Sequence, residues 1–176
     1  MKSILLDVDG VTADFIGGLE RALNHTFSPE DLKEWDVLKK LEPSQREKAL
    51  EALSGTSFWR NLPVKDGAKE GVRFLENMGY EITWVTSPWT SCEGWEAARR
   101  DWLDEHFGLG TQGHHYIPTS SKEKVVGDVF IDDKPENVKG WREAHPGKQA
   151  FIFDAPYNKS FYGAPRLTWG SIGSIL

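Results

Sequence analysis

Apolar residues gather in this chain into short, nearly continuous runs, which alternate with longer segments where they recur at helical spacing. The short runs lie at about 3–8, 80–85, 129–131 and 149–153. Runs of this kind are typical of strands buried on both faces of a parallel sheet. The amphipathic segments lie at about 67–78, 93–106 and 135–144. This order predicts an α/β fold, a Rossmann-like parallel sheet with helices on both faces.

The alternation is interrupted after the first run by a stretch that carries helix signals only. The helices expected there lie at about 13–23, 29–40 and 45–53. The second starts with a cap residue followed by proline, and the third with a capping box. We therefore expect residues 15–62 to form a small helical cap inserted after the first strand. Residues 1–14 and 63–176 would form the core domain.

Composition and charge narrow the class of protein. The 176 residues carry 21 Lys and Arg against 27 Asp and Glu, a net charge of −6, which disfavours binding to nucleic acid polymers or anionic membranes. The single cysteine, Cys92, excludes an internal disulfide and fits a reducing compartment. Asp7 follows the start too soon for a signal peptide, and no apolar run approaches the ~20 residues of a membrane helix. We expect a cytoplasmic protein.

Polar side chains follow three of the expected strands, at the point where each strand ends. They are Asp7 and Asp9, Thr86 and Ser87, and Asp132 and Asp133. The carboxyl ends of parallel strands line one crevice, so these clusters should converge there. Four carboxylates in one crevice would repel one another unless a divalent cation shared them, and oxygen ligands suit Mg²⁺. Taken alone, Asp-x-Asp-Gly could equally be a turn that ends a strand.

The first cluster also suggests a division of roles. Asp7 and Asp9 are two positions apart, so in extended backbone their side chains would share one side. A turn that begins at Gly10 can swing Asp9 away from the metal while its carbonyl stays near. One carboxylate could then attack a substrate while the other handles protons.

Aromatic residues in or beside the expected cap are candidates for holding a flat ligand. They are Phe15, Trp35, Phe58 and Trp59. A nucleobase stacks on such side chains with about 1 to 3 kcal/mol per base. Taken singly, such a residue is more often part of the hydrophobic core than a ligand contact. Other tryptophans lie on strand or helix faces and are assigned to packing: Trp84, Trp95, Trp102 and Trp141.

Four motifs together resemble those of the haloacid dehalogenase superfamily of phosphohydrolases. They are Asp7-Val8-Asp9-Gly10-Val11, Thr86-Ser87-Pro88, Lys122 and Ile131-Asp132-Asp133. More narrowly, residues 7–14, 58–59 with 62–63, 102–108 and 128–135 resemble the 5'(3')-deoxyribonucleotidase family. The likeness covers roughly residues 4–140. Lys124 and Lys134 also lie nearby, but the family spacing of ten residues before Asp132 selects Lys122.

The resemblance implies hydrolysis through an aspartyl-phosphate. Asp7 would attack phosphorus, and Asp9 would protonate the leaving oxygen and then activate water. Thr86 would hydrogen-bond a phosphoryl oxygen, and Lys122 would pair with the phosphate and with Asp7. Ser87 is a further candidate for contact with the substrate.

The resemblance also implies a Mg²⁺ site and a base pocket. Asp7, the backbone carbonyl of Asp9, and Asp132 would hold the metal. Asp133 would contact these ligands without binding the metal itself. Phe15, Phe58 and Trp59 would lie near the base. Trp35 is our addition to that pocket, made on its aromatic character and its place in the expected cap.

We therefore expect a magnesium-dependent phosphomonoesterase that converts (deoxy)ribonucleoside 5'-monophosphates to nucleoside and phosphate, alone or as a homodimer. One alternative is a phosphatase of another small phosphomonoester, such as a sugar phosphate. Another is a non-catalytic binding relative with the same fold. Retention of Asp7, Asp9, Lys122 and Asp132 disfavours the last, since a degenerate relative has no need of all four.

Overall fold

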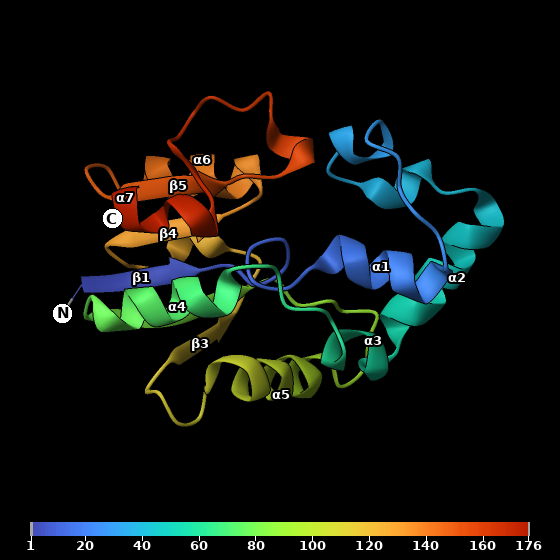
Figure 1. Ribbon diagram of the computed structural model, residues 1–176, viewed down its shortest axis with the longest axis horizontal. Helices are drawn as coiled ribbons and strands as arrows, with labels where there is room; N and C mark the ends of the chain where they lie inside the picture. Colours follow the sequence, from blue (N-terminus) through green and yellow to red (C-terminus); the bar gives the residue numbers. More distant parts are fainter. Residues whose placement is uncertain (1, 176) are drawn as a thin grey trace.

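The computed structural model describes residues 2–175 and contains one six-stranded sheet (Figure 1). Its strands are β1 (Lys2–Leu6), β2 (Tyr80–Thr86), β3 (His115–Pro118), β4 (Val129–Asp132), β5 (Gln149–Phe153) and β6 (Arg166–Leu167). The order across the sheet is β3-β2-β1-β4-β5-β6, and each neighbouring pair is parallel. The predicted α/β class and parallel sheet are confirmed.

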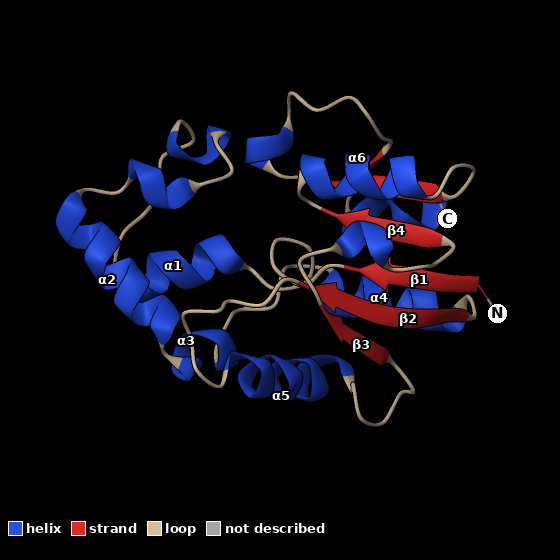
Figure 2. Cartoon of the chain, turned by 180° about the vertical axis from the view of Figure 1, so that it is seen from behind, coloured by secondary structure: helices blue, strands red, loops and turns tan. Residues whose placement is uncertain are grey.

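Helices cover both faces of the sheet because successive strand residues point to opposite sides. Leu5 packs in one apolar cluster with Trp141 of α6 (Pro135–Ala144), whereas Ile4 and Leu6 belong to the larger cluster that includes residues of α4 (Ala68–Asn77). Figure 2 shows α6 on the near side of the sheet, beside β4, with α4 behind β1 and β2. The tryptophans assigned to packing are all buried: Trp84, Trp95, Trp102 and Trp141.

Segment 15–62 lies beyond the carboxyl ends of the strands (Figure 1). It contains α1 (Phe15–Leu23), η1 (Asp31–Lys33), η2 (Val37–Lys40), α2 (Pro43–Ser54) and α3 (Thr56–Arg60). Helix α3 packs against α5 (Trp95–Phe107), which follows β2. The indole of Trp102 donates a 2.8 Å hydrogen bond to the carbonyl of Leu62, so α5 anchors the end of this segment. The division of the chain into a core and a cap stays a prediction.

The expected helix at 29–40 is wrong. This part of the chain forms only the two 3-10 turns η1 and η2, joined by non-helical residues. The hydroxyl of Ser28 donates to the Asp31 carboxylate at 2.6 Å, and such local bonds compete with helix formation. The expected capping box of Ser44 and Glu47 is also wrong, since α2 begins earlier, at Pro43.

Several short elements were not predicted, namely α3, β3 and β6. They are five, four and two residues long, too short for periodicity to separate them from loops. The remaining elements are η3 (Lys122–Lys124), η4 (Pro156–Asn158), η5 (Trp169–Ser171) and α7 (Ile172–Ile175). Within residues 2–175, no helix has the length and apolar character needed to cross a membrane.

Candidate active site

The ends of three neighbouring strands bring the predicted polar clusters together. Leu6 lies beside Trp84 of β2 and Ile131 of β4, so Asp7 emerges between the ends of these strands. The amide of Asp7 donates a 3.0 Å hydrogen bond to the carbonyl of Ile131, which extends the β1–β4 ladder to the site. Thr86 and Asp132 are the last residues of β2 and β4. The sheet therefore gathers side chains that are far apart in the sequence.

Three carboxylates form a buried cluster at this edge of the sheet. Asp7, Asp132 and Asp133 each place an oxygen within 4.8 Å of the others. Burial raises the pKa of Asp7 to about 7; Lys122 opposes this shift, and the charges of Asp132 and Asp9 add to it. Burial also raises the pKa of Asp133 well above its usual value, helped by the charges of Asp7 and Asp132. The cluster is thus costly to keep fully ionised without a cation.

Lys122 supplies part of the compensating charge. Its ammonium lies 2.6 Å from an oxygen of Asp7 and 2.7 Å from an oxygen of Asp132, and its side chain is 2% exposed. Burial works against the charged form, but the charges of Asp132 and Asp7 outweigh it and raise the pKa of Lys122 above its ordinary value. The structure places Lys122 among the aspartates, as the motif spacing predicted, rather than on the solvated surface.

The Asp132 carboxylate is held in place from the side of α6. The amide of Lys134 donates to it at 2.8 Å, and the side-chain amide of Asn137 donates to its two oxygens at 3.2 and 3.0 Å. Asn137 was not predicted as a site residue. Its position in the first turn of a helix directly after the acidic pair was the available signal.

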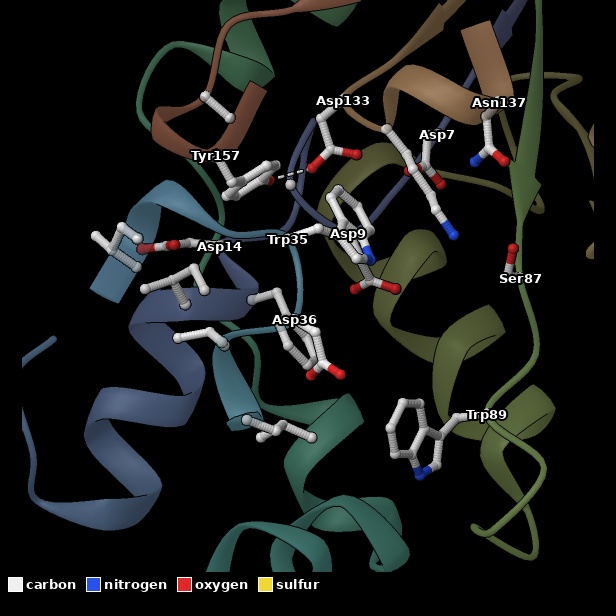
Figure 3. A pocket seen from close by; sticks show the side chains of 18 of the residues that line it. Asp7, Asp9, Asp14, Trp35, Asp36, Ser87, Trp89, Asp133, Asn137 and Tyr157 are labelled. Carbon is white, nitrogen blue, oxygen red and sulfur yellow. Dashed lines mark hydrogen bonds between the residues drawn. The ribbon is translucent and has the colours of Figure 1, made fainter. Parts of the chain in front are cut away.

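Asp133 lies against the turn that follows Asp7. The hydroxyl of Tyr157 donates to one oxygen of Asp133, as the dashed line in Figure 3 marks. Gly10 has φ +83°, and a Cβ there would lie 1.8 Å from that same carboxylate oxygen. Glycine is therefore required both by the backbone conformation and by the close approach of Asp133. Tyr157 was not predicted as a site residue.

The carboxylate cluster fits a divalent cation. The second oxygen of Asp133, Oδ1, is buried and has no hydrogen-bond partner among the residues that the structure describes. A hard cation with oxygen ligands would satisfy this atom and relieve the repulsion that raises the pKa values. Asp133 was expected to stand behind the ligands, but in the structure it offers an oxygen to the cluster alongside Asp7 and Asp132.

Asp9 has a different partner. Its carboxylate is turned away from Asp7, toward the part of the pocket where Asp36 and Trp89 lie (Figure 3). Both of its oxygens lie 2.7 Å from Nη2 of Arg99 on α5. The turn at Gly10 was expected to separate the two aspartates, and in the structure their carboxylates pair with different cations, Lys122 and Arg99.

A cavity of about 720 Å³ extends from this edge of the sheet toward segment 15–62. Its lining includes Asp7, Asp9, Lys122 and Asp133 at one end. The aromatic part of its wall consists of Phe15, Trp35, Trp59, Trp89 and Tyr157. The volume lies within the usual range for pockets that enclose a small molecule.

The predicted substrate contacts fall into two groups. Phe15, Trp35, Trp59 and Ser87 line the cavity. Phe58 is not among the described lining residues; its ring packs against those of Phe15 and Trp59, with centroids 5.8 and 5.2 Å apart. It supports the aromatic wall.

Two polar side chains at the site lack partners within the described chain. The hydroxyl of Thr86 is fully buried and has no hydrogen-bond partner there, and the same holds for the indole nitrogen of Trp89. A buried donor without a partner is costly, so such groups point to an absent ligand or solvent. Trp89 was missed because its position directly after Pro88 gave no periodic signal.

The sequence matches a known family and several known proteins. Residues 1–175 match the family described as 5' nucleotidase, deoxy (pyrimidine), cytosolic type C. A protein of Bordetella parapertussis, provisionally named a 5'(3')-deoxyribonucleotidase, is 33% identical over 98% of this chain and 94% of its own. The human cytosolic-type 5'(3')-deoxyribonucleotidase is 28% identical over 89% of this chain and 81% of its own. The mitochondrial 5'(3')-deoxyribonucleotidase of Mus musculus is 28% identical over 88% of this chain and 74% of its own.

Solved structures share the fold at low sequence identity. A HAD-family hydrolase from Deinococcus radiodurans, solved with bound phosphate and sodium, has a TM-score of 0.61 and 15% identity over 99% of this chain and 93% of that one. A Lactobacillus delbrueckii protein provisionally named a phosphoglycolate phosphatase has a TM-score of 0.65 and 14% identity, over 100% of this chain and 99% of that one. These likenesses establish the architecture alone.

Proposed function

Because the chain belongs to the 5'(3')-deoxyribonucleotidase family of the haloacid dehalogenase superfamily, we propose that it hydrolyses deoxyribonucleoside 5'-monophosphates to nucleoside and phosphate with Mg²⁺. The observation that carries the proposal is one cavity that joins the Asp7 carboxylate to an aromatic wall. A phosphate at one end and a base at the other would use both parts of it.

In the first step, a carboxylate oxygen of Asp7 attacks phosphorus and the bond from phosphorus to the nucleoside oxygen breaks. Asp9 gives its proton to that oxygen as it leaves. A shuttle of this kind contributes about 10²- to 10⁴-fold to the rate. The nucleoside is released, and the phosphoryl group stays on Asp7 as an acyl phosphate.

In the second step, Asp9 takes a proton from a water molecule whose oxygen attacks the phosphorus. The bond from phosphorus to Asp7 breaks, phosphate forms, and both aspartates return to their starting states. The ammonium of Lys122, 2.6 Å from Asp7, would pair with phosphoryl oxygens in both steps. The buried hydroxyl of Thr86 would donate to one of them.

Asp7, the carbonyl of Asp9, and Asp132 would hold the metal, and the free oxygen of Asp133 makes that residue a fourth candidate. When bound, Mg²⁺ neutralises charge so that an anionic nucleophile can approach an anionic phosphate. Asn137 and the amide of Lys134 keep Asp132 in position for this role.

The aromatic wall would hold the base. Trp59 packs against both Phe15 and Trp89: its ring centroid lies 6.0 Å from that of Phe15 and 5.7 Å from that of Trp89. Such a surface offers stacking to any base, and stacking alone selects weakly among bases. A cytoplasmic location and a homodimer stay predictions.

Phosphate release from purified protein tests the proposal. Deoxyribonucleotides, ribonucleotides, 3'-monophosphates and sugar phosphates would be compared, with Mg²⁺ and after metal removal. We expect the highest kcat/KM on a deoxyribonucleoside 5'-monophosphate, with Mg²⁺ required. Highest turnover on a sugar phosphate would favour the alternative phosphatase, and tight nucleotide binding without turnover would favour a binding relative. An Asp7→Asn variant controls for contaminating phosphatases.

A further inference from the structure

The partner of Asp9 is an arginine that lies outside the cavity. Both oxygens of Asp9 lie 2.7 Å from Nη2 of Arg99. The Arg99 side chain is 0% exposed, whereas the Asp9 side chain is 28% exposed. Arg99 is not among the described residues that line the cavity, although Asp9 is. A substrate in the cavity would therefore meet Asp9 and not Arg99.

Three indole rings hold the Arg99 guanidinium. Its central carbon lies 5.4, 5.5 and 5.8 Å from the ring centroids of Trp59, Trp95 and Trp102. Within the described chain, Nε and Nη1 have no hydrogen-bond partner, and Asp9 is the one carboxylate paired with the group. A desolvated cation among aromatic faces is attracted to them, and a packed side chain has little freedom to rotate. Arg99 is thus a fixed point against which Asp9 is oriented.

The same contacts link Asp9 to the wall of the cavity. Trp59 lies in α3, lines the cavity, and stacks near Arg99. Its indole nitrogen donates to the carbonyl of Leu53 at 2.9 Å, which fixes the ring relative to α2. The Trp59 ring therefore has an anchor of its own in α2, whereas the orientation of Asp9 depends on the buried Arg99.

We propose that Arg99 is a positioning residue for the reaction proposed above: it holds the Asp9 carboxylate out of the aspartate cluster and toward the leaving oxygen of the substrate. The inference rests on the proposed function. Without the guanidinium, the Asp9 side chain would be free to take rotamers that point elsewhere, and proton transfer depends on placement within hydrogen-bond reach. Arg99 would act on the chemical steps and not on substrate binding.

Substitutions of Arg99 test whether this residue positions Asp9 or only stabilises the folded protein. Arg99→Met keeps an unbranched apolar stem and removes the guanidinium with its charge, and we expect kcat on the best nucleotide to fall by about 10- to 100-fold with KM changed less than about 3-fold. Formation of phosphoenzyme from p-nitrophenyl phosphate should change little, because that leaving group departs without protonation. Arg99→Lys, which keeps the charge, should recover much of the loss. Arg100→Met is the matched control on the same helix, since Arg100 is exposed and its guanidinium lies over Tyr116.

A double-mutant cycle with Asp9→Asn decides whether Arg99 acts through Asp9. If it does, adding Arg99→Met to Asp9→Asn should cost less than about 3-fold further, whereas independent roles would multiply the two losses. Thermal unfolding of each variant reports on folding, and if Arg99→Met does not fold, Arg99→Lys carries the test. Multiplied losses, or equal losses from Arg99→Lys on nucleotide and aryl phosphate, would overturn the positioning role. A wild-type protein inactive on every phosphomonoester would instead overturn the proposed function.

Discussion

Asp7 and Asp9 are two residues apart, yet the structure gives them opposite surroundings. Asp7 is buried beside Lys122 and two further carboxylates, whereas Asp9 is part-exposed to the cavity and paired with Arg99. A nucleophile needs a fixed position next to the phosphate, and a proton shuttle needs access to both the leaving group and water. The local turn at Gly10 would thus separate the two proposed roles.

This separation predicts different behaviour of two conservative variants. Asp7→Asn should abolish turnover on every substrate, because no acyl phosphate can form. Asp9→Asn should lose about 10²- to 10⁴-fold on nucleotides while still forming phosphoenzyme from p-nitrophenyl phosphate. Rapid acid quench should trap that phosphoenzyme, since its hydrolysis also needs Asp9. Identical behaviour of the two variants on both substrates, with no trapped intermediate, would contradict the division.

The sequence predicts the charged residues of the motifs better than it predicts the residues that contact them. The motif spacing chose Lys122 over two nearby lysines, and the structure buries Lys122 between Asp7 and Asp132. Arg99 was missed although it left a signal: it lies on the helix face that also carries Trp95 and Trp102, where a charged residue is unexpected. Its partner, ninety residues earlier in the chain, could not be read from local pattern.

Among the elements, the loop between β2 and α5 contributes Trp89 to the cavity. If the Trp89 ring stacks on the base, Trp89→Ala should lower kcat/KM for nucleotides, with a loss of transition-state stabilisation of about 1 to 3 kcal/mol. Trp89→Phe should retain most of the activity, because it keeps an aromatic face. Hydrolysis of p-nitrophenyl phosphate gives the comparison; an equal loss on that substrate would mean that Trp89 shapes the site without contacting a base.

Helix α4 depends on a glycine for its contact with the C-terminal part of the chain. A Cβ at Gly71 would lie 2.0 Å from a ring carbon of Trp169, whose indole nitrogen donates to the carbonyl of Val11 at 2.7 Å. Gly71→Ala should therefore destabilise the protein by about 1 to 3 kcal/mol through overpacking. Gly140→Ala, in the interior of α6 with its nearest contact at 3.8 Å, should instead stabilise it by up to about 1 kcal/mol. Urea unfolding measures both, and a stabilising Gly71→Ala would contradict the packing argument.

Two elements were predicted to the residue, whereas elements formed by tertiary contacts were not. The helix at 135–144 and the strand at 149–153 match the structure at both ends. The segment 29–40 has helix start signals but folds as two short turns, and Trp35 between them packs edge-on against Tyr157 at 5.0 Å. Tyr157 belongs to a part of the chain whose sequence carried no motif, so this contact could not be foreseen.

At the scale of the whole molecule, a protein of net charge −6 concentrates several carboxylates at one edge of its sheet. The phosphate group of the proposed substrate is also anionic. Lys122 lies close to two of these carboxylates but is a single cation. Stability and substrate binding should therefore both depend on a divalent cation, and they should do so more strongly when the carboxylates are ionised.

The raised pKa values of Asp7 and Asp133 determine how the stability of the metal-free protein changes with pH. Burial raises the pKa of Asp7 from 3.8 to about 7 and that of Asp133 well above 3.8. In metal-free protein, the folded state then binds more protons than the unfolded state between about pH 4 and pH 7. The stability that these groups contribute is present at low pH and is lost as pH rises through about 7.

Mg²⁺ should offset this loss, because it binds carboxylates in their ionised form. At about a hundred times its Kd, a ligand stabilises a fold by about 2.7 kcal/mol, which corresponds to roughly 5 to 10 °C in Tm for a chain of this length. We expect a rise in Tm of that size when Mg²⁺ is added to metal-stripped protein near pH 8, and a much smaller rise near pH 5. In Asp133→Asn one of the groups that must lose its proton is absent, so the Mg²⁺-induced rise should depend less on pH. An equal rise at both pH values in the wild-type protein would mean that the cation binds elsewhere.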